Sequence, residues 1–281
     1  GNAIYSTSIA LIRAAAEEAK MPVYQYLAQK PIKSVPIPSF NVINGGKKGV
    51  ITQAFNEFIV MPYKADSIYE AVEIAVKVFQ KLGTVIKDHI KSEPGIGGSY
   101  GWTAPSEDPE VVFSMIQEAI DACGYTDKCA FAIDCASSEM YDKDTKTYYL
   151  NGKHLTSDEV IDYVKMLTEK MNFVFVEDML DENDWEGFEK AHQRIKKTLI
   201  IGDDFVATNK ERLTRACASN SIDGFILKPN QIGTITEALD AHEFAKSKGL
   251  LSIPSGRSGG VIGDIAMDFA VGLNVSFIKN G

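Results

Sequence analysis

The chain has 281 residues, of which 45% are hydrophobic and 24% are charged. This balance is typical of a folded globular protein and excludes a disordered or fibrous chain. The net charge of -9 argues against a nucleic-acid backbone or an anionic membrane as the main partner, because both attract clustered Lys and Arg. The length allows one large α/β barrel or two smaller domains.

The cysteines and the apolar runs bear on the cellular compartment. The four cysteines show no CxxC spacing and no dense pattern, so we expect reduced thiols and a cytoplasmic location. No apolar run approaches the roughly 20 residues that span a bilayer, and no signal segment opens the chain. The first residue is Gly and not Met, which leaves open whether the chain was trimmed or belongs to a longer polypeptide.

The first elements follow from apolar spacing. Residues 1–30 predict two short helices that break near Pro22. The runs 35–46 and 54–62 predict two strands, the first with its prolines at the start and a glycine pair at the end. From Ile68 onward, apolar residues recur every three or four positions, which indicates one face of a long helix.

Helix starts and a hairpin are marked farther along. After a glycine-rich loop, a helix is expected to begin near Pro109, since proline suits the first helical turn. The segment 141–153 predicts a hairpin that turns at Asn151-Gly152. Three Thr/Glu pairs match the reciprocal pattern that caps a helix start. These pairs are Thr156 with Glu159, Thr208 with Glu211, and Thr234 with Glu237.

Short apolar runs that read as buried strands alternate with these helices. With the early strands they number eight, which is the number that closes a barrel, so we expect an eight-stranded β/α barrel of TIM type. The last run is followed by no further helix in the sequence. The eight runs are 35–43, 54–62, 129–137, 173–180, 199–205, 225–229, 250–256 and 275–279.

Charged residues stand where four consecutive strands of this barrel end. They are Asp134, Glu177, Asp203 and Lys228. The carboxyl ends of barrel strands meet at one mouth, where such folds assemble their sites. Three carboxylates are hard oxygen ligands that suit Mg²⁺ better than zinc. A divalent cation would lower the pKa of Lys228, so we expect proton abstraction next to a metal-bound carboxylate.

Nine motifs, in order and nearly in spacing, resemble those of the enolase family, the glycolytic phosphopyruvate hydratases. They are FNVINGG, NEF, GYTDK, IDCASSE, VEDMLDENDW, GDD, LKPNQIGTITE, GRSGG and IKNG. The resemblance covers essentially the whole chain and implies an enolase-type barrel that opens ββαα and continues in β/α units. Residues 1–34 would be connecting helices packed on the barrel. Residues 35–281 would form the barrel without its final helix.

The resemblance implies a role for the charged residues at the mouth. Asp134, Glu177 and Asp203 would hold one Mg²⁺ that binds the substrate carboxylate. Lys228 would remove the C2 proton of 2-phosphoglycerate, because a lysine base beside Mg²⁺ is an established arrangement of the enolase superfamily.

Four more residues match family positions that contact the substrate. Lys279 would face the carboxylate of a phosphorylated small carboxylic acid, and Arg257 with Ser258 would hold its phosphate. Glu57 would lie near the leaving hydroxyl group.

Three departures from the family pattern bear on turnover. Where enolases carry the glutamate that protonates the departing hydroxide, this chain has Ser99 and Tyr100, and a tyrosine pKa of about 10 suits that task poorly. Lys48 and Gly256 stand where the family has histidines. The four histidines of the chain lie elsewhere, so none is an obvious substitute.

The family's capping domain, whose lid helps to bind a second Mg²⁺, has no counterpart in the sequence. We therefore expect little dehydratase activity and no well-formed second metal site. The apolar surface left uncovered would suit a protein partner or a homo-oligomer.

Three functional hypotheses remain. The first is a catalytically impaired Mg²⁺-binding barrel that acts as a scaffold or interaction module. The second is an active divergent enolase, with Tyr100 or Lys48 as a substitute acid, or another lyase or epimerase of the superfamily. The third is a part of a longer, active enolase.

Overall fold

The computed structural model describes residues 1–28, 30–46, 54–261 and 263–280. Lys48, which the sequence offers as a substitute acid, lies outside these described residues.

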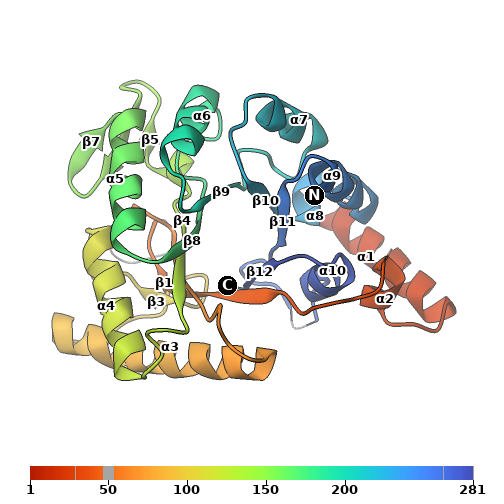
Figure 1. Ribbon diagram of the computed structural model, residues 1–281, viewed down its shortest axis with the longest axis horizontal. Helices are drawn as coiled ribbons and strands as arrows, with labels where there is room; N and C mark the ends of the chain where they lie inside the picture. The colour runs from red at the N-terminus through yellow and green to blue at the C-terminus, as the bar shows by residue number, and fades with distance from the viewer. Residues whose placement is uncertain (29, 47–53, 262, 281) are drawn as a thin grey trace.

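Eight strands form the curled sheet that the sequence predicts. Their spatial order is β11-β10-β9-β8-β4-β2-β1-β12, and a parallel bridge between Ser255 and Lys279 brings β12 back to the end of β11. The expected barrel is therefore confirmed (Figure 1). The strands are β1 (Ile37–Asn44), β2 (Glu57–Met61), β4 (Ala130–Asp134), β8 (Phe173–Glu177), β9 (Leu199–Gly202), β10 (Gly224–Leu227), β11 (Leu251–Pro254) and β12 (Phe277–Asn280).

The second strand runs against its neighbours. β2 is antiparallel to both β1 and β4, whereas the pairs from β4 to β11 and the pair of β1 with β12 are parallel. Because β2 is reversed, its first residue, Glu57, reaches the mouth where the parallel strands end. Two helices follow β2 before β4, which confirms the ββαα opening.

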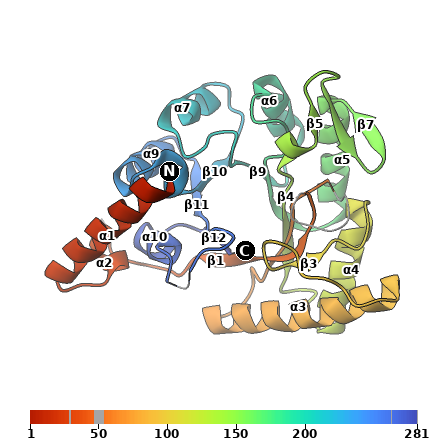
Figure 2. The same ribbon diagram turned by 180° about the vertical axis from the view of Figure 1, so that it is seen from behind.

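Helices surround the barrel in both views (Figures 1 and 2). α1 lies beside α8 and α9, where the hydroxyl of Ser8 accepts the backbone N–H of Ile235 at 3.0 Å. None of the described helices is both long and apolar enough to cross a membrane. The helices are α1 (Asn2–Glu18), α2 (Val23–Leu27), α3 (Ile68–Ile90), α4 (Pro109–Ala122), α5 (Ser157–Lys170), α6 (Trp185–Arg194), α7 (Lys210–Ala218), α8 (Pro229–Ile232), α9 (Ile235–Ser247) and α10 (Ala266–Gly272).

Small strands complete the fold. β3 (Trp102–Thr103) pairs with β1, and an excursion contains β5 (Tyr141–Asp142), β6 (Thr147–Leu150) and β7 (Lys153–Leu155). β6 and β7 form the predicted hairpin, and its turn residues Asn151 and Gly152 have φ values of 49° and 72°. Positive φ at both turn residues matches the twist of a tight hairpin.

Two of the three predicted caps are confirmed. Thr156 and Glu159 form a full capping box, and the Thr234 hydroxyl accepts the backbone N–H of Glu237. The prediction for Thr208 was wrong, because Asn209 caps α7 instead. Thr208 is buried, and its hydroxyl accepts the backbone N–H of Lys228 at 2.9 Å.

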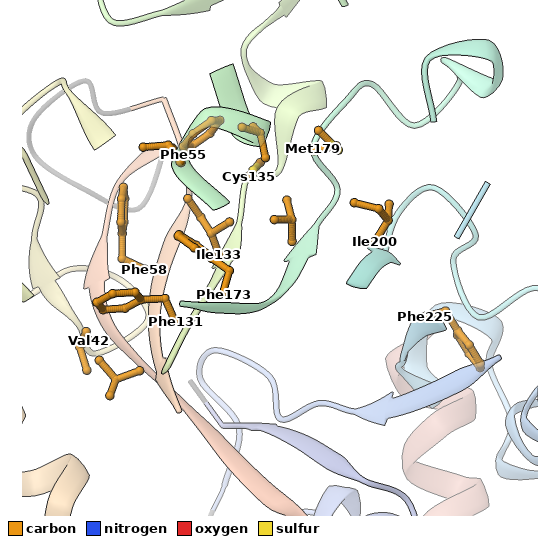
Figure 3. Close-up of a cluster of buried hydrophobic side chains, with 14 of the residues drawn as sticks. Val42, Phe55, Phe58, Phe131, Ile133, Cys135, Phe173, Met179, Ile200 and Phe225 are labelled. Atoms are coloured by element: carbon orange, nitrogen blue, oxygen red, sulfur yellow. The ribbon is translucent and has the colours of Figure 1, made fainter. Parts of the chain in front are cut away.

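The strands carry apolar side chains on both faces. The outward face packs against the helices, where Phe113 of α4 lies 4.9 Å, ring to ring, from both Phe58 and Phe173. Phe58 and Phe173 belong to the cluster of buried apolar side chains that Figure 3 shows. A separate cluster forms from alternate residues on the same strands. Its members are Ile59, Met61, Ala132, Phe175, Ile201, Ile226 and Ile253. Because strand side chains alternate, this second cluster is the inward-facing layer of the barrel.

A buried histidine predicts how stability depends on pH. His242 of α9 shares a hydrogen bond of 2.9 Å with the Ser252 hydroxyl. Burial, with Lys246 adding to it and Glu243 opposing it, lowers the pKa of His242 to about 4. The unfolded chain takes up this proton below about pH 6.5 while the folded chain does not, so stability falls as the pH drops from about 6.5 toward 4.

We expect the parent to lose about 2 kcal/mol more stability than His242→Gln between about pH 7.5 and pH 5. Urea unfolding at the two pH values measures this difference. An equal loss in both proteins would contradict it.

Candidate functional site

A cavity of about 330 Å³ opens at the mouth of the barrel. Seven of the eight predicted site residues line it, namely Glu57, Asp134, Asp203, Lys228, Arg257, Ser258 and Lys279. The eighth, Glu177, has no exposed surface, yet both of its carboxylate oxygens contact Lys279. The structure therefore gathers all eight residues at one place, while their roles stay predictions.

Strand periodicity explains why these residues meet. On each of five strands an apolar residue lies in the inward layer, and a charged residue lies two positions away, at the end of the strand or directly after it. Side chains two apart on a strand point the same way, so the charges form the next layer toward the mouth. The pairs are Ile59 with Glu57, Ala132 with Asp134, Phe175 with Glu177, Ile201 with Asp203, and Ile226 with Lys228.

Lys279 of β12 is the centre of a buried ion cluster. Its Nζ lies 3.0 Å from Glu57 Oε2, 3.0 Å from Asp134 Oδ2, and 2.7 and 2.8 Å from the two Glu177 oxygens. Burial alone would lower the pKa of Lys279, but the carboxylates outweigh it and raise that pKa well above its usual value. Burial and the nearby Asp134 raise the pKa of Glu177.

A second buried pair joins Lys228 to Asp203. Burial opposes the charged form of both groups, yet their mutual attraction raises the pKa of Lys228 and lowers that of Asp203. Gln231 donates to the other oxygen of Asp203 at 2.9 Å. In this arrangement Lys228 is a positively charged ammonium, and Thr208 fixes its backbone.

Asp178 is a site residue that the sequence reasoning missed. Its two carboxylate oxygens accept the backbone N–H groups of Asp203 and Asp204, each at 2.7 Å, so it orders the loop that follows β9. Asp178 is buried and has a φ of 43°, a conformation that costs free energy for a non-glycine residue. Its position directly after Glu177 is the sequence signal that could have identified it as a site residue.

Of the described positions that depart from the family pattern, Ser99 and Gly256 line the cavity. Ser99 is buried and lines the cavity, whereas Tyr100 is 58% exposed and is not among the lining residues. A side chain on Gly256 would meet no atom closer than 3.9 Å. Ser258 donates from its hydroxyl to the backbone oxygen of Gly98 at 2.7 Å.

A family model described as the enolase C-terminal TIM barrel domain matches residues 32–281. The chain belongs to the enolase family. The enolase of Methanococcus vannielii is 38% identical over 281 residues, and that of Methanococcus aeolicus is 36% identical. Both alignments cover the whole chain and 66% of the relative, so the chain spans about two thirds of their length. The enolase of Sulfurisphaera tokodaii is 36% identical, with 67% of its length covered.

Enolases generally use Mg²⁺, so the fit of this enolase-family site to a metal ion matters. Six carboxylates but only three cationic side chains line the cavity, and every predicted ligand atom is an oxygen. This donor chemistry fits a hard divalent cation. Among the described residues, however, no three acidic, His or Cys side chains are grouped closely enough to hold a metal. The predicted ligands are instead paired with Lys279 and Lys228.

The ion cluster predicts a large cost for losing its single cation. Lys279→Met would remove the ammonium that three buried carboxylates share, so we expect a loss of ~3–5 kcal/mol in unfolding free energy. Lys77→Met is the matched control, because Lys77 and Glu73 form an exposed pair and such pairs contribute ~0–1 kcal/mol. Urea denaturation of both variants provides the comparison. Similar small losses would contradict the central role of Lys279.

Proposed function

We propose that the barrel binds Mg²⁺ and a phosphorylated small carboxylic acid, and that it retains the proton-abstracting half of the enolase reaction without the acid half. The observation that carries this proposal is the composition of the cavity wall. Buried Lys228 and Lys279 with their carboxylates line it. Of Ser99 and Tyr100, which stand where the family carries its acid, only Ser99 is among the lining residues, and a serine hydroxyl is no acid.

The proposed metal ligands are Asp134, Glu177 and Asp203. Bound there, the cation would stabilise negative charge that develops on the substrate carboxylate. The excess of carboxylates over cationic side chains at the cavity supports this assignment. Asp203 now neutralises Lys228, so its engagement as a ligand would release Lys228 to act as the base.

The substrate contacts follow from the positions of the other cations. Arg257 lines the cavity and is exposed, so its planar guanidinium can bind two oxygens of a phosphate. Ser258 is its neighbour in the chain. Lys279 would face the substrate carboxylate once the metal shares its carboxylate partners.

Weak turnover would leave ligand binding as the main property of this barrel. We therefore propose a binding or scaffold role in the cytoplasm. Exposed apolar side chains such as Tyr69 and Val76 on α3, at 86% and 49% exposure, are consistent with a protein partner or a second copy.

A second candidate function is an active divergent lyase. Glu139 also lines the cavity, although the sequence reasoning did not single it out. Together with Glu57 it supplies a carboxyl group that could replace the missing acid. The two candidate functions differ in whether the rate of dehydration equals the rate of proton abstraction.

The metal assignment predicts that Mg²⁺ binding depends on Asp203. In titration calorimetry we expect the parent to bind Mg²⁺ and Asp203→Asn to lose ~10-fold or more in affinity, because a charged ligand is removed. Asp204→Asn is the matched control, since it removes the adjacent carboxylate outside the proposed ligand set. Equal losses in the two variants, or no binding to the parent, would refute the assignment.

Because the acid is missing, we predict that the C2 proton exchanges faster than the substrate is dehydrated. In D₂O with Mg²⁺ we expect deuterium to enter C2 of 2-phosphoglycerate at least ~100-fold faster than phosphoenolpyruvate forms, because general acid catalysis contributes about 10²–10⁴-fold. Nuclear magnetic resonance follows both processes in one sample. Lys228→Ala should abolish the exchange. Equal rates of exchange and dehydration would favour the active lyase, and no exchange would rule out the base role.

A further inference from the structure

Three unpaired polar atoms belong to neighbouring residues, one of which, Ser99, lines the cavity. Among the described residues, six buried side-chain polar atoms lack a hydrogen-bond partner, and three of them belong to neighbouring residues. They are Ser99 Oγ, Asn41 Oδ1 and Asn44 Nδ2. Buried polar atoms are normally paired, so an unpaired one at a cavity wall points to a bound molecule that completes it.

The backbone of Ser99 is held firmly on β1. Its N–H donates to Asn44 Oδ1 at 3.3 Å, and its carbonyl accepts from Asn41 Nδ2 at 3.0 Å. Asn44 Oδ1 also accepts the N–H of Gly101 at 2.9 Å. Both asparagines thus serve to fix the backbone around Ser99, and its buried hydroxyl has no hydrogen-bond partner among the described residues.

Two glycines allow this close approach. A Cβ on Gly97 would lie 2.5 Å from the Cβ of Asn44, and one on Gly101 would lie 2.9 Å from the backbone nitrogen of Ile43. Neither contact is possible without a shift of β1. The loop is therefore shaped to press Ser99 against the barrel, where this residue is 2% exposed and lines the cavity.

The position of Ser99 indicates which part of a ligand it would contact. Its chain neighbour Gly98 accepts the Ser258 hydroxyl at 2.7 Å, so the Ser99 loop and the loop of Arg257 and Ser258 meet. A serine hydroxyl donates one hydrogen bond readily, but it does not ionise near neutral pH, so it binds an anion and does not replace the missing acid.

We propose that Ser99 is a phosphate-binding residue, whose hydroxyl donates a hydrogen bond to a phosphate oxygen of the bound acid beside Arg257 and Ser258. This inference rests on the proposed function, because it assumes that the cavity takes a phosphorylated small carboxylic acid. A neutral donor adds to the guanidinium without adding charge, and the ligand pairs an atom that is otherwise buried and unpaired.

The test removes only the hydroxyl oxygen, with Ser99→Ala, and compares three ligands in titration calorimetry with Mg²⁺. 2-Phosphoglycerate has both the phosphate and a C3 hydroxyl. 2-Phospholactate has the phosphate but no C3 hydroxyl, and glycerate has no phosphate. We expect ~10-fold or greater weakening for both phosphorylated ligands and no change for glycerate. Ser114→Ala, at an exposed position on α4, should leave all affinities unchanged.

A stability measurement separates binding from a structural role. Because Ser99 Oγ is unpaired, Ser99→Ala should keep or raise the urea midpoint of the ligand-free protein. A lowered midpoint with unchanged affinities would mean a structural role and overturn the inference.

The remaining outcomes are also decisive. Weakening for 2-phosphoglycerate alone would place the contact on the C3 hydroxyl, and equal weakening for glycerate would place it away from the phosphate. Unchanged affinities would overturn the inference while the parent's binding still supports the proposed function. A parent that binds none of the three ligands would overturn both.

Discussion

The contact of one ammonium group with three buried carboxylates holds the mouth of this barrel together. Lys279 comes from the last strand, and its partners Glu57, Asp134 and Glu177 come from β2, β4 and β8. A buried charge is tolerated only when it is paired, so these strand ends must stay in register for the cluster to exist. The same contact sets the chemistry of the cavity, because it decides how much negative charge a ligand meets there.

The site has an uneven charge distribution that suits a cation on one side and an anion on the other. Asp203 with Lys228 and the Lys279 cluster concentrate carboxylates at the strand ends, while Arg257 and Ser258 stand on a loop at the same cavity. The proposed metal and phosphorylated acid would satisfy both sides together. Ser99, at the cavity wall, has no group that can give up a proton near neutral pH.

Side chains that hydrogen-bond to the backbone of cavity residues determine how well those residues are placed. Asp178 orders the loop of Asp203, and Thr208 holds the backbone of Lys228. Asn41 and Asn44 hold Ser99 in the same way. These groups use hydrogen bonds to backbone atoms, which fix the positions of the loops that carry the cavity residues.

The sequence by itself determined the eight strands, the ββαα opening and the charged residues at the strand ends, because strand alternation and short-range motifs are local properties. It also suggested the family through its motifs. Tertiary structure alone decided which groups are paired. Thr208 matched a capping pattern but supports Lys228, because Asn209 can cap α7 equally well. Which of Ser99 and Tyr100 faces the cavity depends on the contact of two glycines with β1, and no spacing rule encodes a contact between segments so far apart.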